Sequence, residues 1–329
     1  MPIINKDDID YFAEKGCRAA VGIASMLLAE KDADFMLMYA DIGCRFSADV
    51  VLEKYPNKCI QSGIAEQNMI GVAAAMANEG FHVFAVAYGP FITARVLDQI
   101  RVNLGIMESP VILIGLGAGL IMSDLGPSST ALEDIAHIRS IPNITVISPA
   151  DSLETIKAMQ ALADYNKPTY LRITASLNSQ IVYPNDYEFV IGKAIQLKEG
   201  SNTAIIATGT IIYQCLEAAK ILDEIGISCS VINMHTIKPL DVSALDKLMD
   251  YKAIFTIEEH NIIGGLGGAV AEYFAEKKCS PQLKRIGISD EFFNADSYSV
   301  IIERYGLSAK MIAQQIADTL KKEELHFEE

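Results

Sequence analysis

The stretch GIAEQNMIGVAAAMANEGFHVFAVAY, residues 63–88, puts a segment of helical period directly before a short apolar run. Apolar residues recur at helical spacing from Glu66 onward, and Gly80 is a residue suited to ending a helix. The run FHVFAVAY that follows has the composition of a buried strand, and a further short strand ending in KCIQSG comes before Glu66. A helix between two such strands is the repeating unit of α/β proteins with mainly parallel sheets.

The same alternation of strands and helices continues on both sides of this unit. The expected strands are residues 35–41, 81–88, 109–116, 144–151 and 168–174 in the first half, and residues 202–209, 228–234, 252–260 and 282–288 in the second. Helices of the second half are expected at residues 212–226 and 308–322. A polar, proline-bearing connection separates the two series and predicts a boundary near residue 185. We therefore expect an α/β chain with two doubly wound domains, residues 1–185 and 186–329.

Two helices of the first half are expected to begin at capping side chains. Thr130 stands three residues before Glu133, and Asp151 stands three residues before Glu154. A capping residue followed by an acid at this spacing is typical of a helix N-terminus, because the two side chains satisfy free backbone N–H groups.

Composition and charge argue against several kinds of partner. The chain has 329 residues, half of them hydrophobic, and a formal net charge of -15, so it can bury a large core but would be repelled by nucleic acid and by anionic membranes. No apolar run reaches the roughly 18 residues of a membrane span, and the N-terminus lacks a signal-peptide pattern, so we expect a cytosolic protein. Six scattered cysteines without zinc-site spacing predict reduced thiols and no metal site: Cys17, Cys44, Cys59, Cys215, Cys229 and Cys279.

Glu66 is the one carboxylate in a run of small or uncharged residues at the start of the expected helix. On local grounds it has two explanations. An exposed acid at a helix N-terminus contributes about 0.3 to 1 kcal/mol through the helix dipole. Alternatively, the carboxylate is buried and takes part in chemistry.

Six blocks along the chain occur in the order found in the C-terminal half of transketolases. They are GIAEQNMIGVAAAMANEG, VFAVAYGPFITARVLDQIR, ALEDIAHIRSIPNITVISPAD, PTYLR, MHTIKPLD and EEHNIIGGLGGAVAE. The chain closely resembles the pyrimidine-binding subunit of split transketolases. It resembles deoxyxylulose-phosphate synthase and the β chains of 2-oxo-acid dehydrogenases more distantly. Six ordered blocks that span nearly the whole chain are far more specific than one short motif.

This resemblance implies thiamine diphosphate chemistry, with Glu66 as the catalytic residue. In the family, the glutamate of the G-I-x-E-Q motif hydrogen-bonds the pyrimidine ring nitrogen of the cofactor and favours the imino tautomer of its exocyclic amine. A carboxylate that shares a proton with a weakly basic nitrogen calls for a buried site. Tyr88 and Phe91 match the two aromatics that pack on the aminopyrimidine. Asp41 matches the family's aspartate at the end of a strand, where it either binds the cofactor or caps a turn.

The resemblance also implies a partner chain. The family holds the diphosphate and a divalent metal with a G-D-G motif and an asparagine on a separate domain, and no GDG occurs in this sequence. The GGLGG run at residues 264–268 lacks the G-x-G-x-x-G spacing and matches a structural block of the family. We therefore expect an N-terminal, diphosphate-binding subunit that holds Mg²⁺, in a heterotetramer with two copies of each chain (α2β2).

The substrate end departs from the family's pattern. Gly117 stands where a histidine usually precedes A-G, and Leu125 and Ser129 stand where D-G-x-x-H carries its aspartate and histidine. Ala175 replaces an arginine that commonly follows the PTYLR-like strand. Replacing polar groups by small or apolar ones should change which substrate is stabilised, so we expect Ser129 and Gly117 to line the pocket of an atypical enzyme.

Three functions stay open on the sequence. The first is transfer of a two-carbon ketol unit from a modified or non-phosphorylated sugar, and the second is decarboxylation of a 2-oxo acid such as pyruvate with transfer of the acyl unit. The third is a noncatalytic scaffold subunit. His260 is a further candidate for the substrate pocket, although His235 and His260 both fall where packing is the commoner role. Arg95 and Arg101 are expected on a solvated helix face, and the alternative is that they meet acids across a subunit interface.

Overall fold

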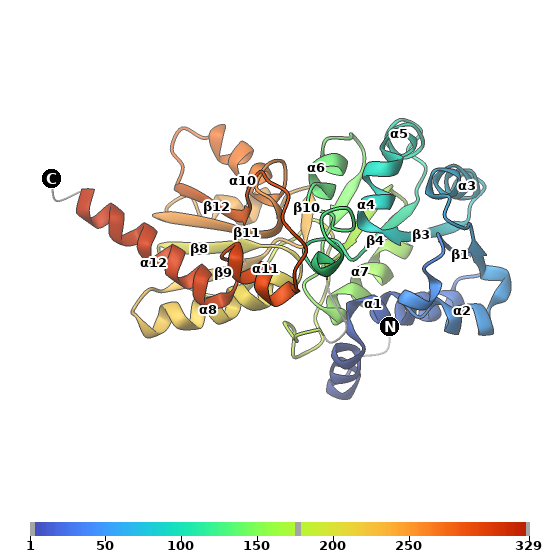
Figure 1. The fold of residues 1–329 in the computed structure, drawn as a ribbon, viewed down its shortest axis with the longest axis horizontal. Coiled ribbons are helices and arrows are strands. Elements are labelled where there is room, and N and C mark those ends of the chain that lie inside the picture. Colours follow the sequence, from blue (N-terminus) through green and yellow to red (C-terminus); the bar gives the residue numbers. More distant parts are fainter. Residues whose placement is uncertain (1–3, 175–178, 327–329) are drawn as a thin grey trace.

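A computed structural model describes residues 4–174 and 179–326, with side chains as far as residue 321. Its two β-sheets lie side by side along the length of the molecule, and helices cover them (Figure 1). Among the described residues, no helix combines the length and the apolar character that crossing a bilayer requires. All six cysteines lie in the described part and are free, which confirms the prediction of isolated thiols.

The first sheet has seven strands, and its order places the strands of the opening stretch near one edge. The order is β10 (Thr236–Lys238), β5 (Thr145–Ile147), β6 (Thr169–Ile173), β4 (Ile112–Leu116), β3 (His82–Tyr88), β1 (Phe35–Tyr39) and β2 (Cys59–Gln61). All neighbours are parallel except β10 and β5. Parallel strands send their carboxyl ends to one edge of the sheet, which is where ligands bind in open α/β folds.

The second sheet has five strands in the order β12 (Gln282–Ile288), β11 (Ala253–Asn261), β8 (Thr203–Ala207), β9 (Cys229–Asn233) and β7 (Ile195–Lys198). Only β7 runs antiparallel to its neighbour. The two parallel-rich sheets confirm the predicted fold class. Strand β10 follows the predicted boundary near residue 185 in the sequence, but it pairs with β5 in the first sheet. A segment of the second half therefore completes the sheet of the first half. The division into residues 1–185 and 186–329 stays a prediction.

Helices lie on both faces of the first sheet, with α3 to α6 on one side and α1, α2 and α7 on the other (Figure 1). The helices are α1 (Lys6–Lys31), α2 (Ala48–Lys54), α3 (Glu66–Asn78), α4 (Gly89–Ile92), α5 (Leu97–Ile100), α6 (Asp134–Arg139), α7 (Ser152–Ala163), α8 (Ile212–Glu224), α9 (Val242–Asp246), α10 (Leu266–Ala275), α11 (Tyr298–Arg304) and α12 (Ala309–His326). A π-helical segment, Arg101–Ile106, follows α5 directly.

The core follows from the alternation of side chains along each strand. In β1, Met36 and Met38 pack in the apolar cluster that contains the buried face of α3, whereas Phe35 and Leu37 pack in the cluster that contains α1. The cluster on the α3 side continues into the second sheet through residues such as Ile206. One continuous apolar core therefore joins the two sheets.

One of the two predicted helix caps is confirmed and the other is wrong. Asp151 caps α7 by accepting a hydrogen bond from the Glu154 backbone N–H at 2.8 Å. The helix expected after Thr130 begins later, at Asp134, and the Thr130 hydroxyl donates to the Pro127 carbonyl instead. Residues 126–132 are held as a loop that pairs with Gly119, so the chain is not free to start a helix at Thr130.

Candidate active site

The carboxyl ends of neighbouring strands in the first sheet bring most of the predicted site residues to one edge. Asp41 follows β1, Tyr88 ends β3 and Gly117 follows β4. Glu66 comes five residues after β2 ends and is the first residue of α3. The order of the strands, not proximity in sequence, makes these residues neighbours.

Glu66 is buried at the N-terminus of α3. Its side chain is 5% exposed, and the N-cap residue Ala65 offers no side-chain oxygen to the helix. Both carboxylate oxygens accept a hydrogen bond from Nη1 of Arg95, at 3.0 Å each. Glu66 is therefore not the exposed acid of the helix-dipole explanation, but a buried carboxylate with one arginine as its partner.

Arg95 connects Glu66 to the two aromatic residues. Its guanidinium carbon lies 4.1 Å from the centre of the Phe91 ring, within the range of a cation–π contact. The Phe91 and Tyr88 rings meet edge to face, with centres 6.4 Å apart and an interplanar angle of 84°. The Arg95 side chain is 42% exposed, as expected of a solvated position, but its contact with Glu66 in the same chain was not predicted.

Gly117 lies beside Tyr88 and has a conformation that disfavours a side chain. Its φ angle is +64°, in the left-handed region. A β-carbon at this position would lie 3.6 Å from Cδ1 of Tyr88 and only 2.9 Å from Cγ of Met122. Met122 thus occupies the space next to Tyr88 into which a side chain at residue 117 would project.

Asp41 lies in the turn after β1, next to the segment that leads into α3. It is exposed and has a φ angle of 53°. Its backbone N–H donates to Oε1 of Gln61 at 2.9 Å, and the same oxygen accepts the Gly63 N–H at 3.1 Å. Gln61 therefore ties the turn after β1 to the segment that leads into α3, and its Nε2 also donates to Oδ1 of Asp41 at 3.5 Å.

The loop of residues 117–131 carries the remaining departures from the family's pattern. Ser129 is half-buried and its N–H donates to the Gly126 carbonyl, whereas Leu125 is 58% exposed in a short 3₁₀ turn. Ser123 and the backbone of Asp296 exchange two hydrogen bonds, so a segment of the second half holds this loop. Ala175, the position of the missing arginine, lies outside the described residues.

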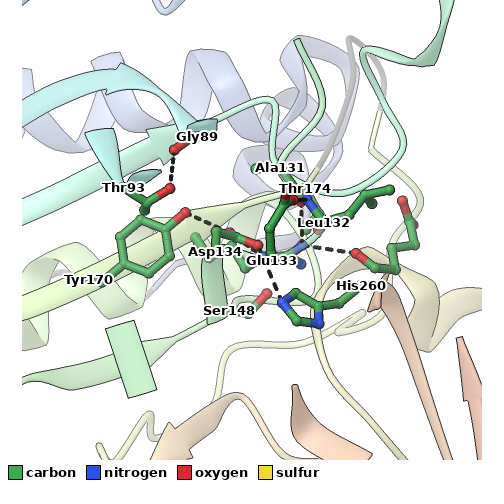
Figure 2. Close-up of polar contacts among 12 residues, drawn as sticks. Gly89, Thr93, Ala131, Leu132, Glu133, Asp134, Ser148, Tyr170, Thr174 and His260 are labelled. Atoms are coloured by element: carbon green, nitrogen blue, oxygen red, sulfur yellow. Dashed lines mark hydrogen bonds and ion pairs between the residues drawn. The ribbon is translucent and has the colours of Figure 1, made fainter. Parts of the chain in front are cut away.

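His260 lies in a buried polar cluster between the two sheets, which we call the junction cluster: Asp134, Tyr170, Arg172, Glu258, Glu259 and His260. Tyr170 and His260 approach Asp134 from two sides (Figure 2). Nδ1 of His260 lies 2.6 Å from the Asn261 carbonyl, and Nε2 lies 3.4 Å from the Ala136 backbone N–H. These partners fit a neutral ring that donates through Nδ1 and accepts at Nε2, and burial lowers its pKa to about 4.

Arg172 and Asp134 form the centre of the junction cluster. Nε of Arg172 donates to Asp134 at 2.7 Å, and Nη2 donates to the carbonyls of Glu259 and Ala131. Tyr170 donates to the same Asp134 oxygen, in space left by Gly115, where a β-carbon would lie 2.4 Å from the tyrosine hydroxyl. Burial opposes ionisation of Asp134, but Arg172 and the other partners hold its pKa below the ordinary value.

Two backbone donors of the glycine-rich run at residues 264–268 are already engaged. The N–H groups of Leu266 and Gly267, at the start of α10, donate to the Glu258 carboxylate at 2.7 and 2.8 Å. A β-carbon at Gly265 would lie 2.0 Å from Oε2 of Glu258, so glycine is required there for the carboxylate to fit. Burial raises the pKa of Glu258 to about 7. This helix N-terminus thus serves a carboxylate of the chain itself.

The residues near Glu66 suit one half of a thiamine-type cofactor. A buried carboxylate can accept a hydrogen bond from a nitrogen heterocycle, and the Tyr88 and Phe91 rings offer faces for stacking. For the metal and diphosphate, the part of the chain that the structure describes contains no group of three or more His, Cys, Asp or Glu side chains placed to bind a cation. The site therefore fits the pyrimidine and lacks a binding set for the metal within its described residues.

Two contributors to the site were not found by sequence reasoning. Arg95 stands four residues after Phe91, a spacing that places side chains on one helical face, and this was the available signal. Met122 had no such signal, because its contact with the space beside Gly117 depends on a loop conformation.

Two protein-family models match the chain, one on each half. The model described as the transketolase pyrimidine binding domain matches residues 14–180, and the model for the transketolase C-terminal domain matches residues 192–312.

Curated relatives match along almost their whole length. A putative transketolase C-terminal section of Methanocaldococcus jannaschii is 36% identical and is covered to 98%, across 94% of this chain. A subunit of the apulose-4-phosphate transketolase of Phocaeicola vulgatus is 32% identical, with 93% of this chain and 98% of that one covered. A 6-deoxy-6-sulfo-D-fructose transketolase subunit of Clostridium sp. is 34% identical, with 87% and 88% covered.

A solved structure has the same architecture. It is a split gene transketolase in the form of an inactive beta4 tetramer, and it matches with a TM-score of 0.85 and 31% identity over 93% of this chain and 98% of that one. With both family domains present in order, and with relatives that are themselves separate subunits, this chain belongs to the transketolase family as the pyrimidine-binding and C-terminal part of a split enzyme.

Proposed function

We propose that this chain is the pyrimidine-binding subunit of a two-chain, thiamine diphosphate-dependent transketolase that transfers a two-carbon ketol unit. The observation that carries the proposal is the placement of a buried carboxylate, Glu66, beside the aromatic pair Tyr88 and Phe91 at the carboxyl edge of the parallel sheet. The family's cofactor supplies, when bound, a centre that stabilises the negative charge formed when the two-carbon unit is cleaved from a ketose.

The roles of this chain's own residues follow from their chemistry. The Glu66 carboxyl group shares a proton with the pyrimidine ring nitrogen through a hydrogen bond, a task for which a buried acid is suited. Tyr88 and Phe91 orient the ring by stacking, which is worth about 1 kcal/mol beyond the burial of area. Asp41, in the turn after β1, is held to the segment before Glu66 through Gln61 and contacts the cofactor from that position.

The diphosphate and Mg²⁺ belong to a partner subunit in this proposal. A diphosphate requires a metal ion and backbone donors to offset its charge. This chain has a net charge of -15, and two N–H donors of its glycine-rich run, those of Leu266 and Gly267, already donate to Glu258. The relatives that are named as transketolase subunits, and the solved beta4 tetramer that is described as inactive, support an assembly that needs a second kind of chain. We propose an α2β2 heterotetramer in the cytosol.

The substrate is proposed to be an atypical sugar. Ser129 and Gly117 stand where the family carries histidines, and Met122 fills the space beside Tyr88. Fewer ionisable groups and one more apolar side chain would weaken the binding of a polar sugar phosphate relative to a modified sugar. Relatives named for apulose 4-phosphate, which is still phosphorylated, and for 6-deoxy-6-sulfo-D-fructose support a modified sugar, and not specifically one without phosphate. His260, which is fully buried, would act on the pocket through the loop and not by touching the sugar.

The test is turnover by the complex of this chain with its N-terminal partner subunit, supplied with thiamine diphosphate and Mg²⁺. The panel contains phosphorylated, unphosphorylated and sulfonated ketoses together with pyruvate. Glu66→Gln should lower turnover by a factor of about 10² to 10⁴, because general acid–base catalysis contributes that much. Asp98→Asn, at an exposed acid of α5, is the matched control and should leave turnover unchanged.

The outcomes separate the three functions. Consumption of a ketose that needs both chains and Glu66 supports ketol transfer. Consumption of pyruvate alone replaces it with acyl transfer from a 2-oxo acid. A stable complex that binds the cofactor but turns over nothing, with either residue at position 66, indicates a scaffold.

A further inference from the structure

Arg95 makes two of the contacts that the proposed pyrimidine site offers, those with Glu66 and Phe91. Its Nη1 lies 3.0 Å from each oxygen of Glu66, and its guanidinium lies 4.1 Å from the centre of the Phe91 ring. A guanidinium is planar, donates hydrogen bonds and stacks on aromatic rings. An aminopyrimidine that carries a proton on its ring nitrogen is also planar, donates from that N–H to a carboxylate and stacks on a ring. Arg95 therefore has the properties that Glu66 and Phe91 would recognise in the cofactor.

Little besides these contacts keeps Arg95 in place. Its side chain is 42% exposed, and the described residues give its guanidinium no hydrogen-bonding partner other than Glu66. An arginine with an exposed guanidinium can move into water at small cost, because its charge stays solvated and its long stem has many rotamers. Glu66 differs, since its carboxylate is 5% exposed and is anchored on the first residue of α3.

We propose that Arg95 and the aminopyrimidine of the cofactor are alternative occupants of Glu66 and the Phe91 ring. The inference rests on the proposed function. In it, Arg95 is a positioning residue that holds the Glu66 carboxylate in its orientation until the ring displaces the guanidinium. The cofactor must break the ion pair and the cation–π contact to bind, so Arg95 weakens the affinity for thiamine diphosphate and limits occupancy when the cofactor is scarce.

The experiment measures the Kd of thiamine diphosphate by isothermal titration calorimetry on the two-chain complex in excess Mg²⁺. Arg95→Met keeps the apolar stem of the side chain and removes its charge and its donors. We expect this variant to bind the cofactor about five- to tenfold more tightly than the wild type, the factor expected from one exposed ion pair and one cation–π contact. Damage to the fold cannot produce a gain in affinity.

Two further variants sharpen the result. Arg101→Met is the matched control, because Arg101 is also exposed and the structure shows no ion pair for it among the described residues. Its Kd should stay within about twofold of the wild type. Arg95→Lys keeps the charge but not the flat stacking surface, and its Kd should fall between the wild type and Arg95→Met.

The outcomes distinguish this inference from the proposed function. A wild-type complex that binds no thiamine diphosphate overturns the proposed function itself. A wild type that binds, with an Arg95→Met variant of equal or weaker affinity, overturns only the competition, because Arg95 would then be neutral or would help to hold the cofactor. Tighter binding by Arg95→Met, together with an unchanged Arg101→Met, supports it.

Discussion

Two arginine–carboxylate pairs share their chemistry but differ in their access to water: Arg172 with Asp134 in the junction cluster, and Arg95 with Glu66 at the candidate active site. In the junction pair the side chains are 1% and 0% exposed, and Arg172 also donates to two backbone carbonyls. In the site pair the carboxylate is buried, but the arginine is 42% exposed. The same two chemical groups meet in both places.

Solvent access decides what each pair can do. Removing one partner of a buried pair leaves a charge without compensation in a low-dielectric interior, so the junction pair cannot exchange partners without loss of structure. A pair whose guanidinium reaches water can open at small cost. The difference indicates that the junction pair is a structural connection between the sheets, and that the site pair is a replaceable contact.

The largest expected effect is that of removing the junction arginine. Arg172→Met should lower the free energy of unfolding by about 3 to 5 kcal/mol, because it leaves Asp134 buried without its cation and removes a donor from two carbonyls. Urea unfolding of the chain measures the change. Adding Asp134→Asn to the same variant should recover part of the loss, since the amide oxygen still accepts from Tyr170 without carrying a charge. A loss below about 1 kcal/mol in the single variant would remove the contrast between the two pairs.

A smaller effect on the free energy of unfolding is expected from pH, through His260 of the junction cluster. Burial lowers the pKa of His260 to about 4, from an ordinary value of 6.5. Between these values the unfolded chain binds more protons than the folded one, so the stabilising contribution is lost as the pH falls from about 6.5 towards 4. Between pH 6.5 and pH 4, the free energy of unfolding should therefore fall by about 2 to 3 kcal/mol less in His260→Gln than in the wild type.

Titrating groups that do not contact His260 are the same in both proteins and cancel in this comparison, whereas Asp134 and Glu258 interact with its ring. Asp134 and Glu258 lie 3.9 and 3.8 Å from its ring nitrogens, and burial raises the pKa of Glu258 to about 7, which acts in the opposite direction. His235, with a pKa that burial also lowers to about 4, gives a second variant that should behave in the same way. If the free energy of unfolding changed with pH equally in the wild type and in His260→Gln, the His260 ring would not be kept neutral by burial.

The smallest effect is expected at the site pair. A double-mutant cycle on stability, with Arg95→Met and Glu66→Gln, should give a coupling energy below about 1 kcal/mol, as for exposed ion pairs. The same cycle on Arg172 and Asp134 should give a clearly larger value. A coupling above about 2 kcal/mol for Arg95 and Glu66 would mean that the guanidinium is held firmly and would contradict the contrast between the two pairs.

Much of the fold was predictable because local patterns in the sequence indicate strands and helices. Every strand expected from apolar runs is present, and Glu66 begins its helix as predicted. The two unpredicted strands, β7 and β10, are short and lie at sheet edges, and both pair antiparallel to their neighbours. Segments of three or four residues carry too little periodicity to be recognised, and their pairing is decided by which edge is available.

Within the candidate site, the residues that belong to motifs were predictable and their partners were not. The motif blocks contain Glu66, Tyr88 and Phe91; Glu66 begins α3 and Tyr88 ends β3, and these ends meet at one edge of the sheet. Arg95 was expected in solvent, and it bonds Glu66 across 29 residues of sequence. Nothing in the sequence near Arg95 or Glu66 predicts that the two side chains are in contact.

By itself, the sequence determined the type and order of the elements, the family of the chain and the carboxylate on which its proposed chemistry depends. These properties depend on periodicity and on motifs, which are local. Only the tertiary structure decided that Arg172 is buried with Asp134 while Arg95 keeps access to water. The physical reason is that the strength of an ion pair depends on the dielectric around it, and that surrounding is made by segments that come together only when the chain has folded.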